Sequence, residues 1–249
     1  MIRFAVIGTN TITDKFLQAA SALPDFKLCA VYSRTLARAQ EYAQKNNVSL
    51  VFDSLEALAD SDQIDAVYIA SPNFCHAAQS ILMMQHHKHV LCEKPIASTL
   101  EDAKAMAEAA KKAAQKGIIA MNAYQYRRVP AIDLAKKFID EGSIGKILNV
   151  RCTYLQSWSA DPASPLSWRF QKDIAGAGTL GDIASHVIDI AQYLAGDIEA
   201  VTGMMQTYIT ERPVQEGGTD LLGTVKLGAD AKRKAVDVDD EDSLLVKVK

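Results

Sequence analysis

The sequence lacks the features that would assign it to several classes of protein. Its four cysteines, Cys29, Cys75, Cys92 and Cys152, form no CxxC pair, which indicates reduced thiols and a cytoplasmic location. No apolar run approaches the roughly 20 residues of a membrane-spanning helix, and the N-terminal MIRFAVIG has no apolar region typical of a signal peptide. The net charge of -3 provides no basic field, so we expect neither a nucleic-acid nor a membrane partner.

Glycine is scarce in the first half of the chain. Gly8 and Gly117 are the only glycines before residue 123, and the rest of the 13 glycines lie later. A chain of 249 residues, 49% hydrophobic and 23% charged, is that of an ordinary globular protein with one large or two modest domains. The glycine contrast favours two domains, which we place at residues 1–122 and 123–249.

Short apolar runs alternate with helical stretches in the first predicted domain. The runs suited to strands buried on both faces are 2–7, 27–32, 51–52, 65–70, 89–92 and 118–121. The helices expected between them are 13–22, 36–46, 55–59, 75–86 and 100–116, with Ser98 and Glu101 at capping-box spacing before the last. This alternation predicts an α/β fold with a doubly wound parallel sheet, which binds ligands beyond the carboxyl ends of its strands.

The second half has a different character. Helices are expected at 130–141 and 182–194, and strands at 146–156, 201–208, 221–227 and 244–248. These elements predict an α+β domain with an open sheet and helices on one face. The last strand, SLLVKVK, runs to Lys249, so we expect either a truncated sheet or an edge that is completed in another way.

The first turn, VIGTNTITDKF, carries only part of a dinucleotide-binding signature. Glycines are needed at positions 8, 10 and 13, but Gly8 is followed by Asn10 and Thr13. Asn10 can adopt the left-handed conformation of a glycine, whereas Thr13 makes close packing of helix on strand less favourable. The candidate cofactor-binding residues of this turn are Gly8, Thr9, Asn10, Thr11 and Ile12. An ordinary turn between a strand and a helix explains the motif equally well.

The stretch VYSRTLAR, at the end of the second strand, indicates which cofactor is preferred. NAD enzymes usually place an Asp or Glu here for the ribose 2′-hydroxyl, whereas this chain has Ser33, Arg34 and, one helical turn later, Arg38. Guanidinium groups pair well with a phosphate, so we expect NADP to be favoured over NAD. Solvated surface arginines are the alternative explanation.

Polar residues also follow the fourth and fifth strands. In YIASPNFCHAA, the residues that can face a ribose or nicotinamide are Ser71, Pro72, Asn73 and His76. A turn that merely caps its own helix is the alternative. HVLCEKPIAS then delivers Glu93 and Lys94 to the same edge of the sheet, where an ammonium group is costly unless it is used.

Two stretches of the sequence contain histidines, and they predict different chemistry. His86, His87 and His89 in QHHKHV do not share one helix face and have no accompanying carboxylate, so we expect no metal site. Asp182 and His186, by contrast, are four residues apart and lie on one face of a predicted helix. A carboxylate beside an imidazole raises its pKa and fixes its orientation, which suits a proton donor. A helix N-terminal Asp and an incidental His are the simpler explanation.

Together these motifs resemble the Gfo/Idh/MocA family of NAD(P)-dependent oxidoreductases. EKP at 93–95 is similar to the family's lysine motif, and WR at 168–169 with G-x-L-x-D-x-x-x-H at 178–186 is similar to its second-domain motif. NAYQYRRVPA at 122–131 and VDVDDED at 236–242 resemble connecting segments of the family. The resemblance covers essentially the whole chain. It implies a Rossmann domain and an α/β domain whose open sheet often mediates oligomer contacts, which allows a homo-oligomer through the C-terminal sheet.

The resemblance also implies roles for individual residues. Lys94 would contact the nicotinamide ribose and the reacting hydroxyl, Asp182 would hold the substrate, His186 would exchange the proton, and Asn122 would contact the cofactor. Hydride transfer between a carbinol carbon and nicotinamide C4 moves one proton on or off the oxygen, which His186 can carry while Lys94 stabilises alkoxide charge. We therefore expect Lys94 and His186 to converge over one nicotinamide ring.

The leading hypothesis is an NADP- or NAD-dependent dehydrogenase or reductase acting on a sugar, polyol or similar hydroxylated molecule. Besides Asp182 and His186, the candidate substrate-lining residues are Tyr126, Arg127, Tyr154, Trp168 and Arg169. Packing between the domains explains these five side chains equally well. The alternative function is a catalytically silent NADP-binding regulatory or partner protein on the same fold.

Overall fold

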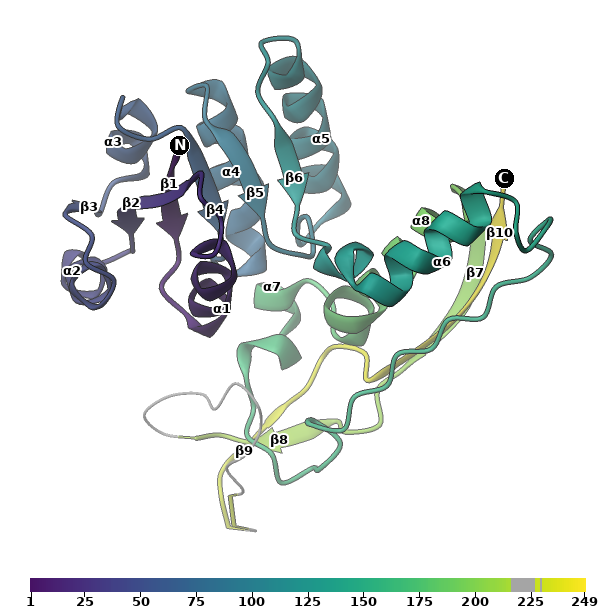
Figure 1. Cartoon of the computed structure of the whole chain (residues 1–249). Coiled ribbons are helices and arrows are strands. Elements are labelled where there is room, and N and C mark those ends of the chain that lie inside the picture. Colours follow the sequence, from purple (N-terminus) through teal and green to yellow (C-terminus); the bar gives the residue numbers. More distant parts are fainter. Residues whose placement is uncertain (216–226, 229) are drawn as a thin grey trace. The chain divides into compact units, whose positions relative to one another are not determined.

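The computed structural model describes residues 1–215, 227–228 and 230–249 (Figure 1). The chain divides into two compact units, Met1–Ala123 and Tyr124–Lys249. This division falls one residue after the boundary that the sequence predicts. None of the helices among the described residues has both the length and the apolar character needed to cross a membrane.

The N-terminal unit is built on a parallel sheet of six strands (Figure 1). The strands are β1 (Ile2–Ile7), β2 (Phe26–Tyr32), β3 (Leu50–Phe52), β4 (Ala66–Ile69), β5 (His89–Cys92) and β6 (Ala120–Asn122). Their order across the sheet is β3-β2-β1-β4-β5-β6, so the winding direction reverses between β1 and β4. A reversal of this kind opens a ligand-binding crevice at the carboxyl ends of the strands. The predicted doubly wound sheet is confirmed.

Helices cover both faces of this sheet because successive side chains of a strand point to opposite faces. The helices are α1 (Thr11–Ala20), α2 (Leu36–Lys45), α3 (Leu55–Asp60), η1 (Asn73–Cys75), α4 (His76–Gln85) and α5 (Leu100–Ala114). Ile7 of β1 belongs to one core cluster with Met83 of α4. The preceding residue, Val6, belongs to a second cluster with Leu17 of α1 and Tyr42 of α2. Successive residues of β1 therefore pack into two different cores, one on each face of the sheet.

The predicted elements of this unit match the observed ones within two residues at each end. One detail of capping is different from the prediction. Helix α5 is capped by Thr99, whose side chain accepts a hydrogen bond from the backbone N–H of Asp102, and not by Ser98 with Glu101. The structure therefore shifts the predicted cap by one residue.

The C-terminal unit is α+β, as predicted. Its helical segments are η2 (Gln125–Arg128), α6 (Pro130–Asp140), η3 (Trp168–Phe170), α7 (Lys172–Ala175), the π-helical turn η4 (Leu180–Ala184) and α8 (Ser185–Ala195). Its strands are β7 (Ile198–Gln206), β8 (Glu211–Pro213), β9 (Arg233–Ala235) and β10 (Glu241–Val248). Strand β7 pairs antiparallel with β10, and β8 pairs antiparallel with β9.

The strand predicted at 146–156 is wrong. In the structure this segment pairs with no strand of the described residues, and Leu148 and Leu155 are 86% and 84% exposed. Alternation makes a segment competent for pairing, but a strand also requires a neighbour to receive its backbone hydrogen bonds. The prediction at 221–227 lies, except for Leu227, outside the described residues. Strands β8 and β9 were not predicted because they are short and carry no apolar alternation.

Candidate active site

Gly8 forms the turn between β1 and α1 at the point where the sheet reverses. Its φ of +107° is in the region that favours glycine, and a Cβ at this position would lie 2.7 Å from the carbonyl oxygen of Ala70. Any other residue would therefore push β1 and β4 apart at their carboxyl ends. The glycine leaves this backbone edge open to a ligand, as a dinucleotide-binding turn requires.

Asn10 and Thr13 stand where the signature has glycines, and each has a bonding role. Asn10 does not use the left-handed conformation that an asparagine can adopt, because it is extended at φ −132° and caps α1. Its side-chain oxygen accepts from the N–H groups of Ile12 and Thr13, at 2.9 and 3.1 Å, and its amide donates to the carbonyl of Ala70 at 2.6 Å. Thr13 is fully buried and its hydroxyl donates to the carbonyl of Gly8 at 2.8 Å. Hydrogen bonds of Asn10 and Thr13 thus stabilise the turn between β1 and α1, at positions where the signature has glycines. Thr9 is half-buried and Thr11 exposed beside it.

The end of β2 presents a short polar surface. Ser33 is buried and its N–H donates to the carbonyl of Phe52, whereas Arg34 and Arg38 are exposed. Burial raises the pKa of the Cys75 thiol, and the nearby positive charge of Arg34 opposes that rise. Arg34 therefore lies close to the turn that follows β4, which is the edge where a dinucleotide would bind.

The turn after β4 is tied to the turn after β5 by His76. This imidazole is 1% exposed, with Nδ1 2.8 Å from the carbonyl oxygen of Pro95 and Nε2 2.9 Å from that of Ser71. Burial lowers the pKa of His76. His76 is a candidate cofactor contact by its sequence position, but both of its ring nitrogens lie against backbone carbonyls of the two turns. The Ser71 hydroxyl donates to Gln79 at 2.6 Å, and Asn73 is 9% exposed in η1, just after Pro72.

Glu93 and Lys94 leave β5 at the same edge. The hydroxyl of Tyr68 donates to one carboxylate oxygen of Glu93 at 2.7 Å, and the N–H of Lys94 donates to the other at 3.2 Å. Tyr68 is 2% exposed and stacks on Phe16 with ring centroids 3.9 Å apart. Burial, with the Glu93 charge, raises the pKa of Tyr68 far above its ordinary value, so this hydroxyl stays a donor. Sequence reasoning missed Tyr68 because it lies inside an apolar strand.

Asn122 completes this edge of the sheet. It ends β6 in register with Cys92, and the next N–H, of Ala123, donates to the carbonyl of Cys92 at 2.8 Å. The Lys94–Pro95 peptide bond, which follows β5 after Glu93, is cis. The carboxyl ends of β1, β4, β5 and β6 therefore bring Gly8, Ser71, Lys94 and Asn122 to one edge.

In the C-terminal unit an imidazole is enclosed by tyrosines. His186, in the first turn of α8, is 5% exposed. Tyr126 stacks on its ring at 4.4 Å, while Tyr124 and Tyr154 approach at 5.9 and 6.2 Å. The hydroxyls of Tyr126 and Tyr154 are 2.8 Å apart, and this hydrogen bond raises the pKa of Tyr126 to about 12. Tyr124 was not predicted, because the linker motif gives no signal for it.

Asp182 lies one turn before His186 and pairs with an arginine. Its carboxylate is 3.3 Å from Nε of Arg169, and the Arg169 guanidinium lies over the ring of Trp168 at 4.6 Å and that of Trp158 at 5.9 Å. Asp182, Arg169 and Trp158 border a cavity of about 140 Å³. Three residues that the sequence singles out, Asp182, Arg169 and Trp168, are thus brought together. His186 lies in the same unit, in the helix that follows Asp182.

Arg127 has a partner that the sequence analysis did not identify. It was predicted to line the substrate site, but its guanidinium makes a bidentate pair with the buried Asp189, at 2.8 and 2.5 Å. It also lies over the ring of Tyr193 at 5.2 Å. The hydrogen bonds to Asp189 raise the pKa of Arg127. A buried carboxylate requires such a partner, so Arg127 joins η2 to α8.

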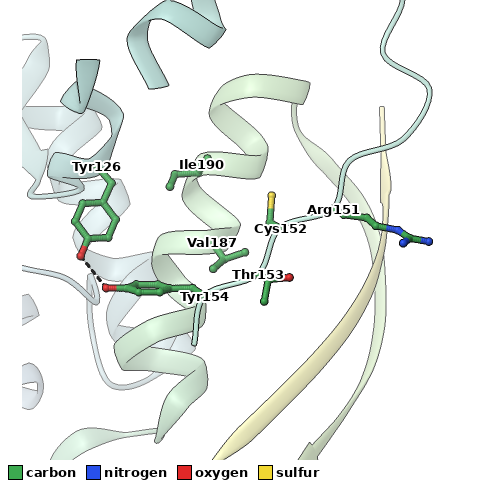
Figure 2. A pocket seen from close by; sticks show the side chains of 7 residues that line it. All are labelled: Tyr126, Arg151, Cys152, Thr153, Tyr154, Val187 and Ile190. Atoms are coloured by element: carbon green, nitrogen blue, oxygen red, sulfur yellow. Dashed lines mark hydrogen bonds between the residues drawn. The ribbon is translucent and has the colours of Figure 1, made fainter. Parts of the chain in front are cut away.

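Figure 2 shows a second cavity, of about 430 Å³, in the C-terminal unit. The residues that line it are Tyr126, Arg151, Cys152, Thr153, Tyr154, Val187 and Ile190. The hydroxyls of Tyr126 and Tyr154 point toward one another at one end of it (Figure 2). Tyr154 borders both cavities. In the part of the chain that the structure describes, no group of three His, Cys, Asp or Glu side chains could hold a metal ion.

Comparison with known protein families identifies both units. Residues 2–121 match the model of the oxidoreductase family with a NAD-binding Rossmann fold, and residues 132–248 match the GFO/IDH/MocA C-terminal domain. The chain belongs to the Gfo/Idh/MocA family. The resemblance inferred from the lysine and Asp/His motifs is confirmed.

Two named relatives are dehydrogenases of levoglucosan and of scyllo-inositol. Levoglucosan dehydrogenase from Pseudarthrobacter phenanthrenivorans is 50% identical over 228 residues, covering 91% of this chain and 56% of that protein. A scyllo-inositol 2-dehydrogenase (NADP(+)) from Bacillus subtilis is 42% identical over 79% of this chain and 59% of its own length. The structure of levoglucosan dehydrogenase in complex with NADH and levoglucosan matches 99% of this chain and 63% of that chain, at a TM-score of 0.86 and 41% identity. The chain thus spans less than two thirds of the length of these relatives.

Proposed function

We propose that the protein is a nicotinamide-dependent oxidoreductase that transfers a hydride between nicotinamide C4 and a carbinol or carbonyl carbon of a sugar or polyol. The observation that carries this proposal is the acid–base group of the C-terminal unit, in which Asp182 and His186 lie one helical turn apart beside aromatic rings. The named relatives, which act on levoglucosan and scyllo-inositol, support the class of substrate.

The carboxyl edge of the N-terminal sheet has features that suit a dinucleotide. Gly8 leaves no side chain between β1 and β4, and the amide end of the α1 helix favours a pyrophosphate through its partial positive charge. Asn10, Ser71 and Asn122 supply polar groups along the same edge. In this proposal His76 fixes the two turns against which the cofactor binds and does not itself contact it.

When bound, the nicotinamide supplies or accepts the hydride. In the direction of oxidation, the substrate C–H bond breaks as the hydride leaves, and the hydroxyl proton passes to His186. Lys94 stabilises the negative charge that develops on the oxygen. Asp182, held by Arg169, accepts a hydrogen bond from a substrate hydroxyl. Trp168 and Tyr154 offer aromatic faces that suit the C–H surfaces of a sugar.

The preference for NADP depends on the exposed Arg34 and Arg38 after β2. The relatives differ in this respect, since one structure is a complex with NADH and the other enzyme is named for NADP(+). We expect NADPH to bind more tightly than NADH, and Arg34→Ala with Arg38→Ala to remove the difference. Lys104→Ala, an exposed cation on α5, is the matched control. Equal affinity of the wild type for NADPH and NADH would reject the assignment of Arg34 and Arg38 to cofactor preference.

A second copy of the chain is proposed to cover the β7–β10 pair. Met204 and Leu245 are diagonal neighbours on one face of this pair and are 77% and 74% exposed. Exposed apolar side chains gathered on one sheet face mark interaction surfaces. We expect Leu245→Glu to reduce the molar mass measured by light scattering while the far-UV circular dichroism stays unchanged. A wild type that is monomeric at high concentration would exclude this interface.

The enzymatic proposal is tested by incubating the protein with NAD or NADP and a panel of sugars and polyols. We expect at least one substrate to change the absorbance band of the reduced nicotinamide. Levoglucosan and scyllo-inositol are the first compounds to test. Tight binding of the cofactor without turnover of any compound would favour the alternative, a silent NADP-binding protein. Absence of cofactor binding would reject both functions.

A further inference from the structure

Asp239, in the turn before β10, is bonded to the loop that begins the Asp182/His186 helix. One carboxylate oxygen accepts from the N–H of Gly178 at 2.9 Å, and the other accepts from the N–H of Leu180 at 2.6 Å. The N–H of Thr179 donates to the backbone carbonyl of Asp239 at 3.0 Å. Three consecutive amides at the start of this helix are therefore held by one residue.

The backbone of Gly178 packs so closely against Val238 and Asp239 that no side chain fits at position 178. A Cβ on Gly178 would lie 2.1 Å from the carbonyl oxygen of Asp239 and 2.9 Å from a methyl group of Val238. The N–H of Asp182 donates to the carbonyl of Gly178 at 3.0 Å, so the held loop continues directly into the turn that carries Asp182. The position of Asp182, and of His186 one turn later, depends on this contact.

Asp242 adds a second carboxyl group to the same cluster. Both of its side-chain oxygens are buried, and no group among the described residues donates a hydrogen bond to them. Its neighbour is the carboxylate of Asp239. Two carboxylates only accept hydrogen bonds, so Asp242 and Asp239 can bond to each other only when a proton lies between them.

We propose that Asp239 is the positioning residue for the Asp182/His186 helix, and that Asp242 holds Asp239 in place by donating a carboxyl proton to it. Ionisation of Asp242 removes this bond, places two negative charges side by side, and loosens the start of the helix. The catalytic meaning of this inference depends on the proposed function, but the proton between the two carboxyls does not.

The other charged groups around the cavity have partners of their own. Asp182 pairs with Arg169, Asp240 accepts from the N–H groups of Tyr208 and Ile209, and Glu241 accepts from the hydroxyl of Tyr208. The hydroxyl of Tyr154, also at the cavity, is bonded to Tyr126. Burial first, and then the charge of Asp239, raise the pKa of Asp242 to about 7. Asp242 therefore changes its protonation state near neutral pH.

The two tryptophans of the sequence provide a readout that needs no activity. Trp158 borders the cavity, and both Trp158 and Trp168 contact Arg169, the partner of Asp182. We expect the intrinsic fluorescence of the wild type to change with a midpoint near pH 7. This transition should disappear in Asp242→Asn, which keeps a donor toward Asp239 but cannot ionise. Glu241→Gln, the exposed neighbour, is the control and should retain it.

The pH dependence of kinetics then tests positioning. In the wild type, kcat should fall several-fold above the midpoint of the fluorescence change, and Asp242→Asn should remove that part of the decline. Asp239→Asn should lower kcat at least tenfold at every pH, with a smaller effect on cofactor binding by the other unit. A fluorescence transition that persists unchanged in Asp242→Asn overturns the proposal. An inactive wild type that still shows the transition would reject the proposed function and leave the shared proton standing.

Discussion

Strand β4 of the N-terminal unit and strand β7 of the C-terminal unit are both rich in apolar residues, but they have opposite environments. All four residues of β4 are buried, whereas all but the first of the nine residues of β7 are exposed. β4 lies in the middle of six strands with helices on both faces, whereas among the described residues β7 pairs only with β10. Apolar sequence therefore makes a strand ready for burial, but the neighbouring elements determine whether it is buried.

The largest expected effects concern the proposed reaction, to which we assign one group from each unit. We expect Lys94→Ala and His186→Ala each to lower the rate at least about 100-fold, as is typical for positioned acid–base and charge-stabilising groups. If both act in one reaction, the double variant should be much less impaired than the product of the two effects. His86→Ala, at the end of α4, is the control and should retain full activity.

Strictly multiplicative effects of Lys94→Ala and His186→Ala would indicate that the two groups act in separate steps. Normal turnover by both single variants would reject the catalytic assignment altogether. Steady-state kinetics with the best substrate of the panel would distinguish these outcomes.

Core deletions should sharpen the comparison of the two sheets. Ile69 of β4 is fully buried, so Ile69→Ala should lower the free energy of unfolding by about 2–5 kcal/mol. Leu245 of β10 is 74% exposed, and Leu245→Ala should change it by less than about 0.5 kcal/mol in the monomer. Denaturant unfolding at low protein concentration measures both. A large loss for Leu245→Ala would show that this face is covered within the chain.

Two carboxyl groups should give the smallest effects, with opposite signs. Asp65 accepts from Arg3 at 2.6 to 3.0 Å, and this partner lowers the pKa of Asp65 to about 2. The folded state binds its proton less tightly than the unfolded chain, so Asp65 stabilises the protein above about pH 4 and this contribution is lost as the pH falls toward 2. Asp65→Asn should therefore lower the Tm at pH 7 by a few degrees and have little effect at the lowest pH.

Asp242 has the reverse dependence. Because its folded-state pKa is raised to about 7, the unfolded chain releases the proton first, and stability falls as the pH rises from about 4 to about 7. Asp242→Asn should therefore raise the Tm at pH 8 by a few degrees, and this gain should vanish near pH 4. Differential scanning calorimetry across this range tests both variants. A gain that is independent of pH would indicate a packing effect and not a titration.

Much of the N-terminal edge was predictable because its signals are local. The apolar run 89–92 fixes β5, and a parallel strand must deliver Glu93 and Lys94 to its carboxyl end. The extended conformation of Asn10 was not predictable, because Asn10 caps α1 and its amide donates to the carbonyl of Ala70. That carbonyl is 60 residues away in the sequence, so no local pattern could reveal it.

The motif of the C-terminal site was predictable from the sequence, but the residues that bond to it were not. The four-residue spacing of Asp182 and His186 predicts that they share a helical face, and the structure places them in the successive helical segments η4 and α8. The partner of Arg127 and the role of Asp239 came only from pairs of residues about 60 positions apart. The segment 146–156 has the alternation of a strand, but whether it pairs depends on a neighbour that its own pattern does not specify.

Periodicity and short motifs by themselves determined the doubly wound sheet and the residues that lie at the carboxyl ends of its strands. These features follow from the steric preferences of adjacent residues and from the period of apolar side chains. Only the tertiary structure decided which polar groups are partners, which apolar faces are covered, and which carboxyl holds a proton near neutral pH. Burial and charge–charge distances set those properties, and both arise only when distant parts of the chain pack together.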